Sequence, residues 1–185
     1  MKKLLCIALV YSVLISCTSS TKIYFVRHAE KGTGSQDPDL TPEGKERAQQ
    51  LASYLRKKKI KAIYSTQTKR TVQTAEPTSA MEKIPIQYYR NDTAQKFLYH
   101  VLERGKNTLI VGHSNTTINM LKELSLDPTI KEIPDDDYDN IFIVTLKSRS
   151  GPSGFHLRLK ESTYGAKSPP ANTEGKKTST MSSTQ

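Results

Sequence analysis

Residues 23–28 read Ile23-Tyr24-Phe25-Val26-Arg27-His28, an apolar run that ends in an arginine and a histidine. A second apolar run, Leu109-Ile110-Val111, ends in a similar way, in Gly112-His113. Short apolar runs rich in β-branched and aromatic residues predict buried strands. Because the carboxyl ends of the strands form the ligand crevice in open α/β sheets, we expect both histidines to face one site.

Further apolar runs predict the rest of a sheet. The predicted strands cover residues 23–26, 62–64, 84–88, 108–111 and 141–146, with a weaker strand at 155–159. Helical patterns occupy the intervals between them. Strands that alternate with helices need crossover connections, which predicts a three-layer α/β/α sandwich with a largely parallel central sheet.

The predicted helices have recognisable boundaries. Thr41-Pro42-Glu43 combines an N-cap, a proline and an acidic first turn, and an apolar stripe of helical period follows it. A second helix is predicted from about Thr68 and is expected to be interrupted around Pro77, because the residue before a proline is disfavoured in helical conformation. Two more helices are predicted over 92–104 and 114–124, the latter capped by Ser114.

The amino-terminal segment has the order of an export signal. Residues 1–16 contain two lysines followed by an apolar run that is short for a bilayer span, and they are predicted to be a signal peptide. The end of this run, Leu14-Ile15-Ser16-Cys17, resembles the bacterial lipobox. That resemblance implies a lipid on Cys17, a tether over 17–21, and a periplasmic or outer-membrane lipoprotein of the cell envelope. An ordinary secretory signal and an uncleaved anchor are the alternatives.

Charge and cysteine content limit the possible partners. The net charge of +10 favours anionic partners, but much of the excess is diffuse, in 56–59 and in the carboxyl-terminal part, so a solvated surface is favoured over nucleic-acid binding. The two cysteines, Cys6 and Cys17, leave no thiol pair for a disulfide or a zinc site in an exported domain. Residues 22–164 are predicted to be the folded domain, and 165–185 a disordered basic tail.

A third cationic residue points to phosphate chemistry. Arg70 follows the predicted strand at 62–64 and lies in the first turn of the next helix, so it too is expected at a carboxyl end of the sheet. A pocket with the guanidiniums of Arg27 and Arg70 and the imidazoles of His28 and His113 suits a dianionic phosphoryl group. His28 could be the nucleophile, and the other three could stabilise the transferred group.

Four ordered motifs resemble the histidine phosphatase superfamily, also called the phosphoglycerate mutase-like family. They are Arg27-His28-Ala29-Glu30, Asp39-Leu40-Thr41-Pro42-Glu43-Gly44, the stretch from Tyr64-Ser65 through Arg70 to Thr74-Ala75, and Val111-Gly112-His113-Ser114. The resemblance implies that His28 is transiently phosphorylated, that Arg27, Arg70 and His113 bind the transferred group, and that no metal or other cofactor is needed.

The sequence departs from the family pattern in two places, and both departures are typical of a compact branch of the family. Ala29 replaces the usual glycine, as in the compact phosphohistidine phosphatase branch, and no insertion separates Arg70 from His113. Many relatives carry the catalytic acid in that insertion. Asp92 is the predicted proton donor, because it follows the strand at 84–88, but a plain N-cap is an equal alternative.

The function expected from these residues is hydrolysis of phosphomonoesters or phosphohistidine, in a small phosphorylated substrate or a phosphoprotein. A phosphoglycerate mutase-like phosphotransferase is one alternative, and a catalytically silent phosphate-binding envelope lipoprotein is another. Ser114-Asn115 after His113 disfavours a phytase-like enzyme. No role is assigned to His100 or His156, and 135–137 is predicted to be a solvated turn.

Overall fold

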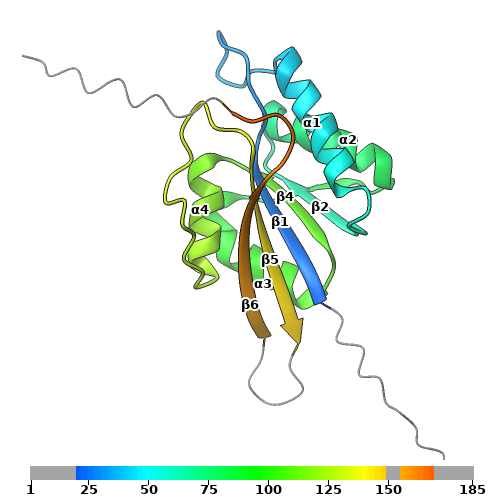
Figure 1. Ribbon diagram of the computed structural model, residues 1–185, viewed down its shortest axis with the longest axis vertical. Coiled ribbons are helices and arrows are strands. Elements are labelled where there is room, and N and C mark those ends of the chain that lie inside the picture. The colour runs from blue at the N-terminus through cyan, green and yellow to red at the C-terminus, as the bar shows by residue number, and fades with distance from the viewer. Residues whose placement is uncertain (1–19, 149–154, 169–185) are drawn as a thin grey trace, which may run out of the picture.

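The computed structural model describes residues 20–148 and 155–168 (Figure 1). The predicted signal peptide, the proposed lipid site at Cys17 and most of the predicted tail lie outside the described residues. Within those ranges, no helix has both the length and the apolar character needed to cross a bilayer.

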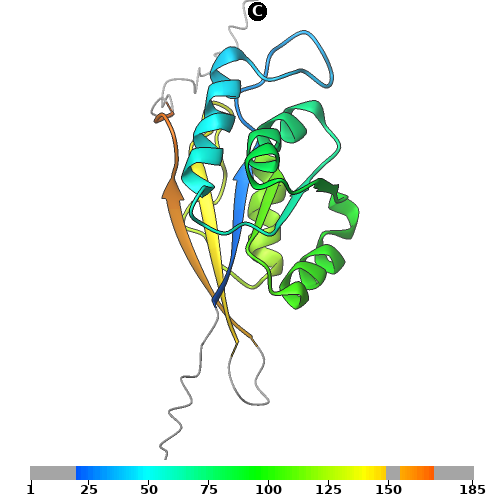
Figure 2. The same cartoon turned by 90° about the vertical axis from the view of Figure 1, so that its right-hand side faces the viewer.

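The central sheet is mixed and mostly parallel, as predicted. Its strand order is β3-β2-β4-β1-β5-β6, in which the first four strands run parallel and the last two are antiparallel to their neighbours. Figure 2 shows β6 in orange at one edge of the sheet. The strands are β1 (Ser20–Arg27), β2 (Ala62–Ser65), β3 (Ile86–Tyr88), β4 (Thr108–Gly112), β5 (Asn140–Ser148) and β6 (Phe155–Thr163).

Helices cover both faces of this sheet, which confirms the predicted α/β/α sandwich. They are α1 (Pro42–Leu55), α2 (Lys69–Glu82), α3 (Ala94–Arg104) and α4 (Ser114–Glu123), with a short 3-10 helix at Asn91–Thr93. Alternate residues of β1 point to opposite faces. Ile23 and Phe25 pack in the core beneath α3 and α4, whereas Tyr24 and Val26 pack in the core beneath α1 and α2.

The predicted interruption of the second helix is wrong. The helix α2 continues through Pro77 to Glu82, although the proline has no N–H to donate to the carbonyl four residues earlier. Thr71, Thr74 and Ala75 are fully buried on its inner side. We infer that packing of this side overrides the local preference of the sequence.

The start of α4 also differs from the prediction by one residue, because His113 rather than Ser114 occupies its N-cap position.

The first residues of the predicted tail are held against the domain. The Ala166 N–H donates to Oε1 of Gln50 at 2.8 Å, and the Ala166 carbonyl accepts from Arg47 at 2.8 Å. The backbone N–H of Tyr138 donates to Ser168 Oγ at 2.8 Å. The ordered part of the chain therefore continues past residue 164, at least to Ser168.

Candidate active site

The carboxyl ends of the parallel strands bring Arg27, His28 and His113 to one end of the sheet. Arg27 ends β1 and is paired with Gly112, which ends β4, so His28 and His113 follow neighbouring strands. The backbone N–H of His28 donates to the Gly112 carbonyl at 2.9 Å. The centroids of the two imidazole rings lie 5.6 Å apart in an edge-to-face arrangement.

His28 is oriented with one ring nitrogen available for reaction. Its Nδ1 lies 2.8 Å from the Ala29 carbonyl oxygen. A carbonyl can only accept, so Nδ1 carries the proton in a neutral ring and the lone pair is on Nε2. The side chain is only 3% exposed, which restricts the ring to this position. This tautomer is the one that a nitrogen nucleophile requires.

A buried threonine connects this histidine to the start of α2. The Ala29 N–H donates to Oγ1 of Thr74 at 2.9 Å, and the same hydroxyl donates to the Arg70 carbonyl at 2.7 Å. One side chain thus joins the loop after β1 to the helical turn that contains Arg70. The relative positions of His28 and Arg70 depend on that link.

His113 is positioned by two threonine hydroxyls. Its backbone N–H donates to Oγ1 of Thr116 at 2.9 Å, and its Nε2 lies 3.1 Å from Oγ1 of Thr66. Thr66 follows β2 and also lies 3.0 Å from the hydroxyl of Thr71. Thr66 was not singled out from the sequence, although it lies within the motif between Tyr64 and Arg70.

Arg70 lies beside an acidic residue from the loop before α1. Its Nη1 is 3.4 Å from Oδ1 of Asp37, and that carboxylate also accepts from the Lys69 backbone N–H at 3.0 Å. The Arg70 side chain is 18% exposed, so one edge of the guanidinium remains accessible. Asp37 was also missed, because nothing in its local sequence distinguishes it from a loop residue.

Arg27 is enclosed by residues 134–138. The solvated turn predicted at 135–137 is confirmed for Asp135 and Asp136, which are exposed in a turn. The contact of this segment with the site was not predicted: Arg27 donates to the Asp137 carbonyl at 3.2 Å and lies 3.3 Å from Oδ1 of Asp135. The Arg27 guanidinium carbon also stacks 4.5 Å from the centre of the Tyr138 ring. That ring lies 6.1 Å from the His28 ring, so the segment forms one wall of the site.

Both imidazoles are neutral at physiological pH. Burial, followed by the nearby positive charges, lowers the pKa of His28 from 6.5 to about 3. Burial and the charges of Arg70 and Arg27 lower the pKa of His113 to about 4. Neighbouring guanidiniums and low solvation disfavour a further cation here, which leaves the Nε2 lone pair of His28 free.

The described side-chain contacts of Asp92 are with Arg90 and not with the other predicted site residues. Its carboxylate is exposed and accepts two hydrogen bonds from Arg90, the shorter 2.6 Å. The hydrogen bond with Arg90 lowers the pKa of Asp92, which favours the carboxylate and opposes its use as a proton donor. It does not cap α3 either, because Thr93 occupies the position before that helix. Its role as the acid stays a prediction, and this geometry argues against it.

Glu30 supports the site from outside. Its carboxylate forms an ion pair with Arg47, with an Nη2 to Oε1 distance of 2.7 Å. Close approach of α1 to this residue requires a glycine at position 44, since a Cβ there would lie 2.2 Å from the Glu30 carbonyl oxygen. This contact explains why a glycine follows the Thr41-Pro42-Glu43 helix start.

The donor groups of the site match an oxyanion. The Nε atoms of Arg27 and Arg70 are buried and have no protein partner, although buried donors are normally hydrogen-bonded. A phosphoryl group presents acceptor oxygens that could satisfy them. Within the described ranges, no cluster of three or more histidine, cysteine, aspartate or glutamate residues could hold a metal ion.

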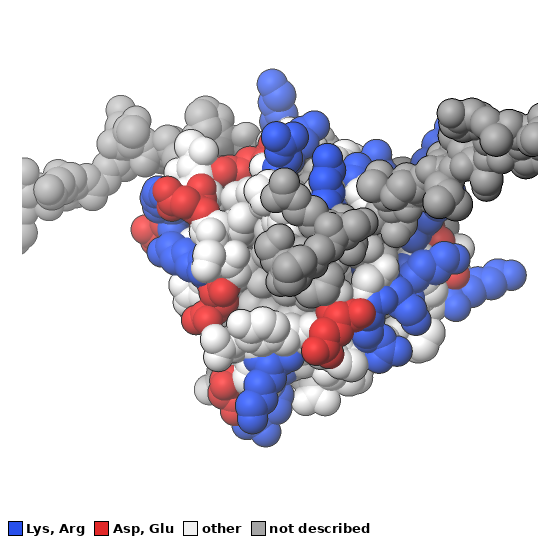
Figure 3. Space-filling view, turned by 90° about the horizontal axis from the view of Figure 1, so that it is seen from below, with Lys and Arg blue, Asp and Glu red and all other residues white. Residues whose placement is uncertain are grey.

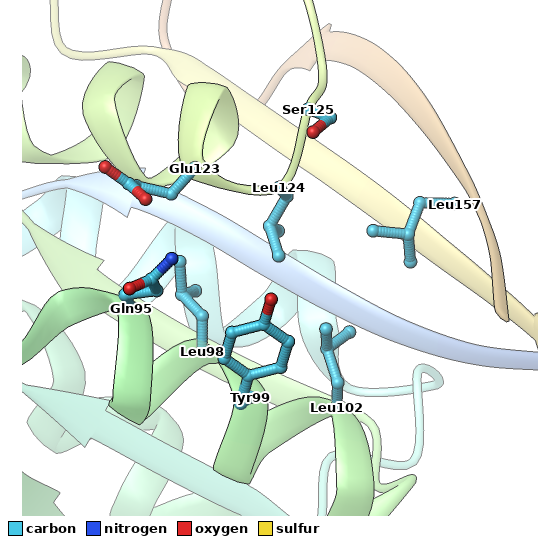
Figure 4. Close-up of a pocket in the computed structure, with 8 residues that line it drawn as sticks. All are labelled: Gln95, Leu98, Tyr99, Leu102, Glu123, Leu124, Ser125 and Leu157. Carbon is cyan, nitrogen blue, oxygen red and sulfur yellow. The ribbon is translucent and has the colours of Figure 1, made fainter. Parts of the chain in front are cut away.

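A separate apolar pocket lies away from this chemistry, between α3, α4 and β6 (Figure 4). Leu98, Leu102 and Leu157 contribute apolar side chains to it, and Tyr99 is 61% exposed at its edge. In the sheet, Leu157 pairs with Leu146, and Leu146 pairs with Thr21 near the beginning of β1. The pocket therefore does not adjoin the histidines.

Sequence comparison identifies a class for part of the chain. Residues 23–91 match the family model of the histidine phosphatase superfamily (branch 1). Human 6-phosphofructo-2-kinase/fructose-2,6-bisphosphatase 4 is 37% identical over 75 residues, which are 37% of this chain and 16% of that protein. The chain thus aligns with a small part of this relative. His113 lies beyond the matched residues, and the fold brings it to the site.

Solved structures share the architecture of the whole domain. Mycobacterial glucosyl-3-phosphoglycerate phosphatase superposes with a TM-score of 0.62 at 12% identity, covering 76% of this chain and 97% of that one. A putative phosphohistidine phosphatase SixA from Agrobacterium tumefaciens superposes with a TM-score of 0.57 at 20% identity, covering 78% and 99%. The chain therefore has the α/β fold of the histidine phosphatase superfamily, and residues 23–91 carry that family's sequence pattern.

Proposed function

We propose that this chain is a phosphatase that hydrolyses phosphomonoesters or phosphohistidine through a phosphorylated His28. The single observation that carries the proposal is the buried His28 ring, whose Nδ1 is bound to the Ala29 carbonyl and whose Nε2 therefore holds a free lone pair. The unpartnered Nε donors of Arg27 and Arg70 supply the complementary site for the transferred group.

The reaction has two displacements. First, Nε2 of His28 forms a bond to phosphorus while the bond from phosphorus to the leaving group breaks. The leaving atom, an ester oxygen or an imidazole nitrogen of phosphohistidine, takes a proton from water or a general acid unless it is stable as an anion. Second, a water molecule attacks phosphorus, the nitrogen–phosphorus bond breaks, and inorganic phosphate leaves with both water protons, so that neutral His28 is restored. Arg27, Arg70 and His113 stabilise the charge on the equatorial oxygens in both steps.

The identity of the proton donor determines which substrates react well. Asp92 is ion-paired and exposed, so we expect little help for a poor leaving group. Aryl phosphates, whose leaving oxygen needs no proton, are therefore the best first substrates. A phosphate-binding protein without turnover is the second candidate, because the geometry of Asp92 leaves the acid unassigned.

Mutase activity is less favoured by the same structure. Between Arg70 and His113 the chain forms only α2, β3, the 3-10 helix, α3 and β4, with no added element above the site. Few residues could then retain a phosphorylated acid between two transfers. Phosphate exchange between two substrates without release of inorganic phosphate would support the mutase alternative.

Replacement of the nucleophile tests the proposal. We expect His28→Ala to lower aryl phosphate hydrolysis by more than about 10⁴-fold, because a missing nucleophile removes the covalent route. Rapid acid-free quench should trap a phosphoenzyme in the native chain and none in the variant. His156→Ala, at an exposed position on β6, is the matched control and should retain full activity. Undiminished hydrolysis by His28→Ala would contradict the proposal, and binding without any phosphoenzyme would favour the silent alternative.

We further propose that a lipid on Cys17 holds the enzyme at the cell envelope. The support is the export-like order of residues 1–16 and the lipobox-like sequence that ends in Cys17. Metabolic labelling with a radioactive fatty acid should mark the native chain and not Cys17→Ser.

A further inference from the structure

The end of the sheet opposite the histidines is organised by one asparagine. Oδ1 of Asn107 accepts from the Lys22 N–H at 2.9 Å, and its Nδ2 donates to the Lys58 carbonyl at 2.7 Å. The Lys61 N–H donates to the Asn107 carbonyl at 2.7 Å. The beginning of β1, the turn after α1 and the loop before β4 are thereby held together.

Six exposed lysines lie on these three segments, and we name them the basic end. None of them forms an ion pair within the part of the chain that the structure describes. Figure 3 views the molecule from below and shows Lys and Arg side chains along the right of this face and also at its top, left and bottom, with Asp and Glu side chains mainly at the left and near the centre. Acidic residues also lie toward this end, since Glu82, Glu103 and Glu123 lie at or next to the carboxyl ends of α2, α3 and α4. The basic end consists of Lys22, Lys57, Lys58, Lys59, Lys61 and Lys106.

The chain enters the domain at this same end. β1 begins at Ser20, beside Lys22, and the lower part of Figure 1 shows where this strand starts. Cys17 precedes Ser20 by a segment that could span at most about 10 Å. The histidines follow the other ends of β1 and β4, about 25 Å away along an eight-residue strand.

We propose that the basic end docks on an anionic bilayer surface, which turns the phosphatase site away from the membrane. The lysines would face anionic phospholipid headgroups. This orientation uses the proposed lipid on Cys17 only as an added tether, and it does not depend on catalysis. Each lysine near an anionic surface raises affinity by about fivefold, so several together give a measurable preference.

Vesicle binding by the full chain tests this surface. The probes are vesicles of phosphatidylcholine alone and of phosphatidylcholine mixed with phosphatidylglycerol. Apolar contributions of any leader or lipid are common to both kinds of vesicle, so the ratio of the two affinities reports the cationic side chains of the whole chain, Lys2 and Lys3 included, and the variants below assign it to the basic end. We expect the native chain to prefer the anionic vesicles by about tenfold or more at low salt, and the preference to fall as salt is added.

Two triple variants of equal net charge separate the basic end from overall charge. Lys57→Gln, Lys59→Gln and Lys61→Gln together should reduce the preference by about tenfold or more. The control removes three exposed lysines outside the basic end and should retain the preference. Its members are Lys31→Gln, Lys45→Gln and Lys167→Gln.

Three results would overturn the proposal. They are equal affinity for neutral and anionic vesicles, equal losses in the two triple variants, and binding to soluble heparin without a vesicle preference. The last result would indicate a soluble polyanion as the partner. Aryl phosphate hydrolysis by the basic-end variant should equal that of the native chain, so failure of the docking surface and failure of the phosphatase proposal give different results.

Discussion

At the scale of single residues, the site depends on hydrogen bonds that set the direction of groups already present in the motifs. The contact of His28 Nδ1 with the Ala29 carbonyl leaves Nε2 as the nitrogen with a free lone pair. Thr74 joins Ala29 to the turn that contains Arg70. None of these bonds involves the transferred group itself. They determine whether two guanidiniums and two imidazoles meet at one point, namely those of Arg27, Arg70, His28 and His113.

Thr74→Val removes the shared hydroxyl and keeps the shape of the side chain. The Ala29 N–H is then buried without an acceptor, so we expect the free energy of unfolding to fall by about 1–3 kcal/mol. Urea denaturation followed by circular dichroism measures this. Thr163→Val, at an exposed position on β6, should change little. Equal stability of the two variants would show that the Thr74 bonds contribute nothing.

The lowered pKa values of the two histidines predict how stability depends on pH. The unfolded chain binds protons on these rings near pKa 6.5, whereas the folded chain binds them only near pKa 3 for His28 and pKa 4 for His113. Their contribution to stability is therefore complete above about pH 6.5 and is lost as pH falls toward 4. Urea midpoints across this range should fall less steeply in His28→Gln than in the native chain. His156→Gln is the control and should follow the native slope, and a native slope in His28→Gln would contradict the pKa assignment.

At the scale of elements, tertiary packing decides where helices begin and end. α2 passes through Pro77 because Thr71, Thr74 and Ala75 bury its inner side. The continuous helix joins the turns that contain Arg70 and Thr74 to the residues that follow Pro77. The sequence rule for a residue before proline describes a local preference, and here that preference is smaller than the packing energy.

Pro77→Ala tests whether the helix bears a local cost. An alanine can donate an N–H to the carbonyl four residues earlier, so we expect the free energy of unfolding to rise by about 1–3 kcal/mol. The midpoint of urea denaturation measures the change. Pro42→Ala is the control, because Pro42 begins α1 where no such bond is lost, and no gain is expected. A loss of stability in Pro77→Ala would contradict this interpretation of α2.

At the scale of the whole molecule, Arg47 connects the active-site loop to the end of the described chain. It forms an ion pair with Glu30 and donates to the Ala166 carbonyl at 2.8 Å. The Arg47 side chain is 6% exposed, so little water can replace it as the hydrogen-bond partner of Glu30 and of the Ala166 carbonyl. Residues 165–168 consequently belong to the domain in structural terms.

Arg47→Met leaves the Glu30 carboxylate without its partner and frees the Ala166 carbonyl. We expect the free energy of unfolding to fall by about 1–3 kcal/mol, because the partly buried Glu30 carboxylate loses its counterion and the Ala166 carbonyl loses a donor. Limited trypsin digestion should also cut faster after Lys167. Lys45→Met, on the exposed side of α1, is the control. Equal trypsin rates in the two variants would show that Arg47 does not hold this segment.

The sequence was sufficient to predict the strand positions to within a few residues and the meeting of Arg27, His28, Arg70 and His113 at one edge. The strand positions follow from hydrophobic periodicity, which is a local property of the sequence. The convergence of the side chains follows from the general rule that the carboxyl ends of the strands form the ligand crevice. Thr66, Asp37 and Tyr138 escaped prediction because each reaches the site from a loop. Loop conformations are set by contacts between distant segments, which a single sequence does not display.

By itself the sequence determined the class of fold, the order of its elements and the residue types that converge at the carboxyl ends of the strands, because hydrophobic periodicity and strand-end placement are encoded locally. The tertiary structure alone decided the tautomer of His28, the wall formed by 134–138, the pairing of Asp92 with Arg90, and the basic end opposite the histidines. These features arise from contacts between segments far apart in the chain, whose geometry exists only after folding.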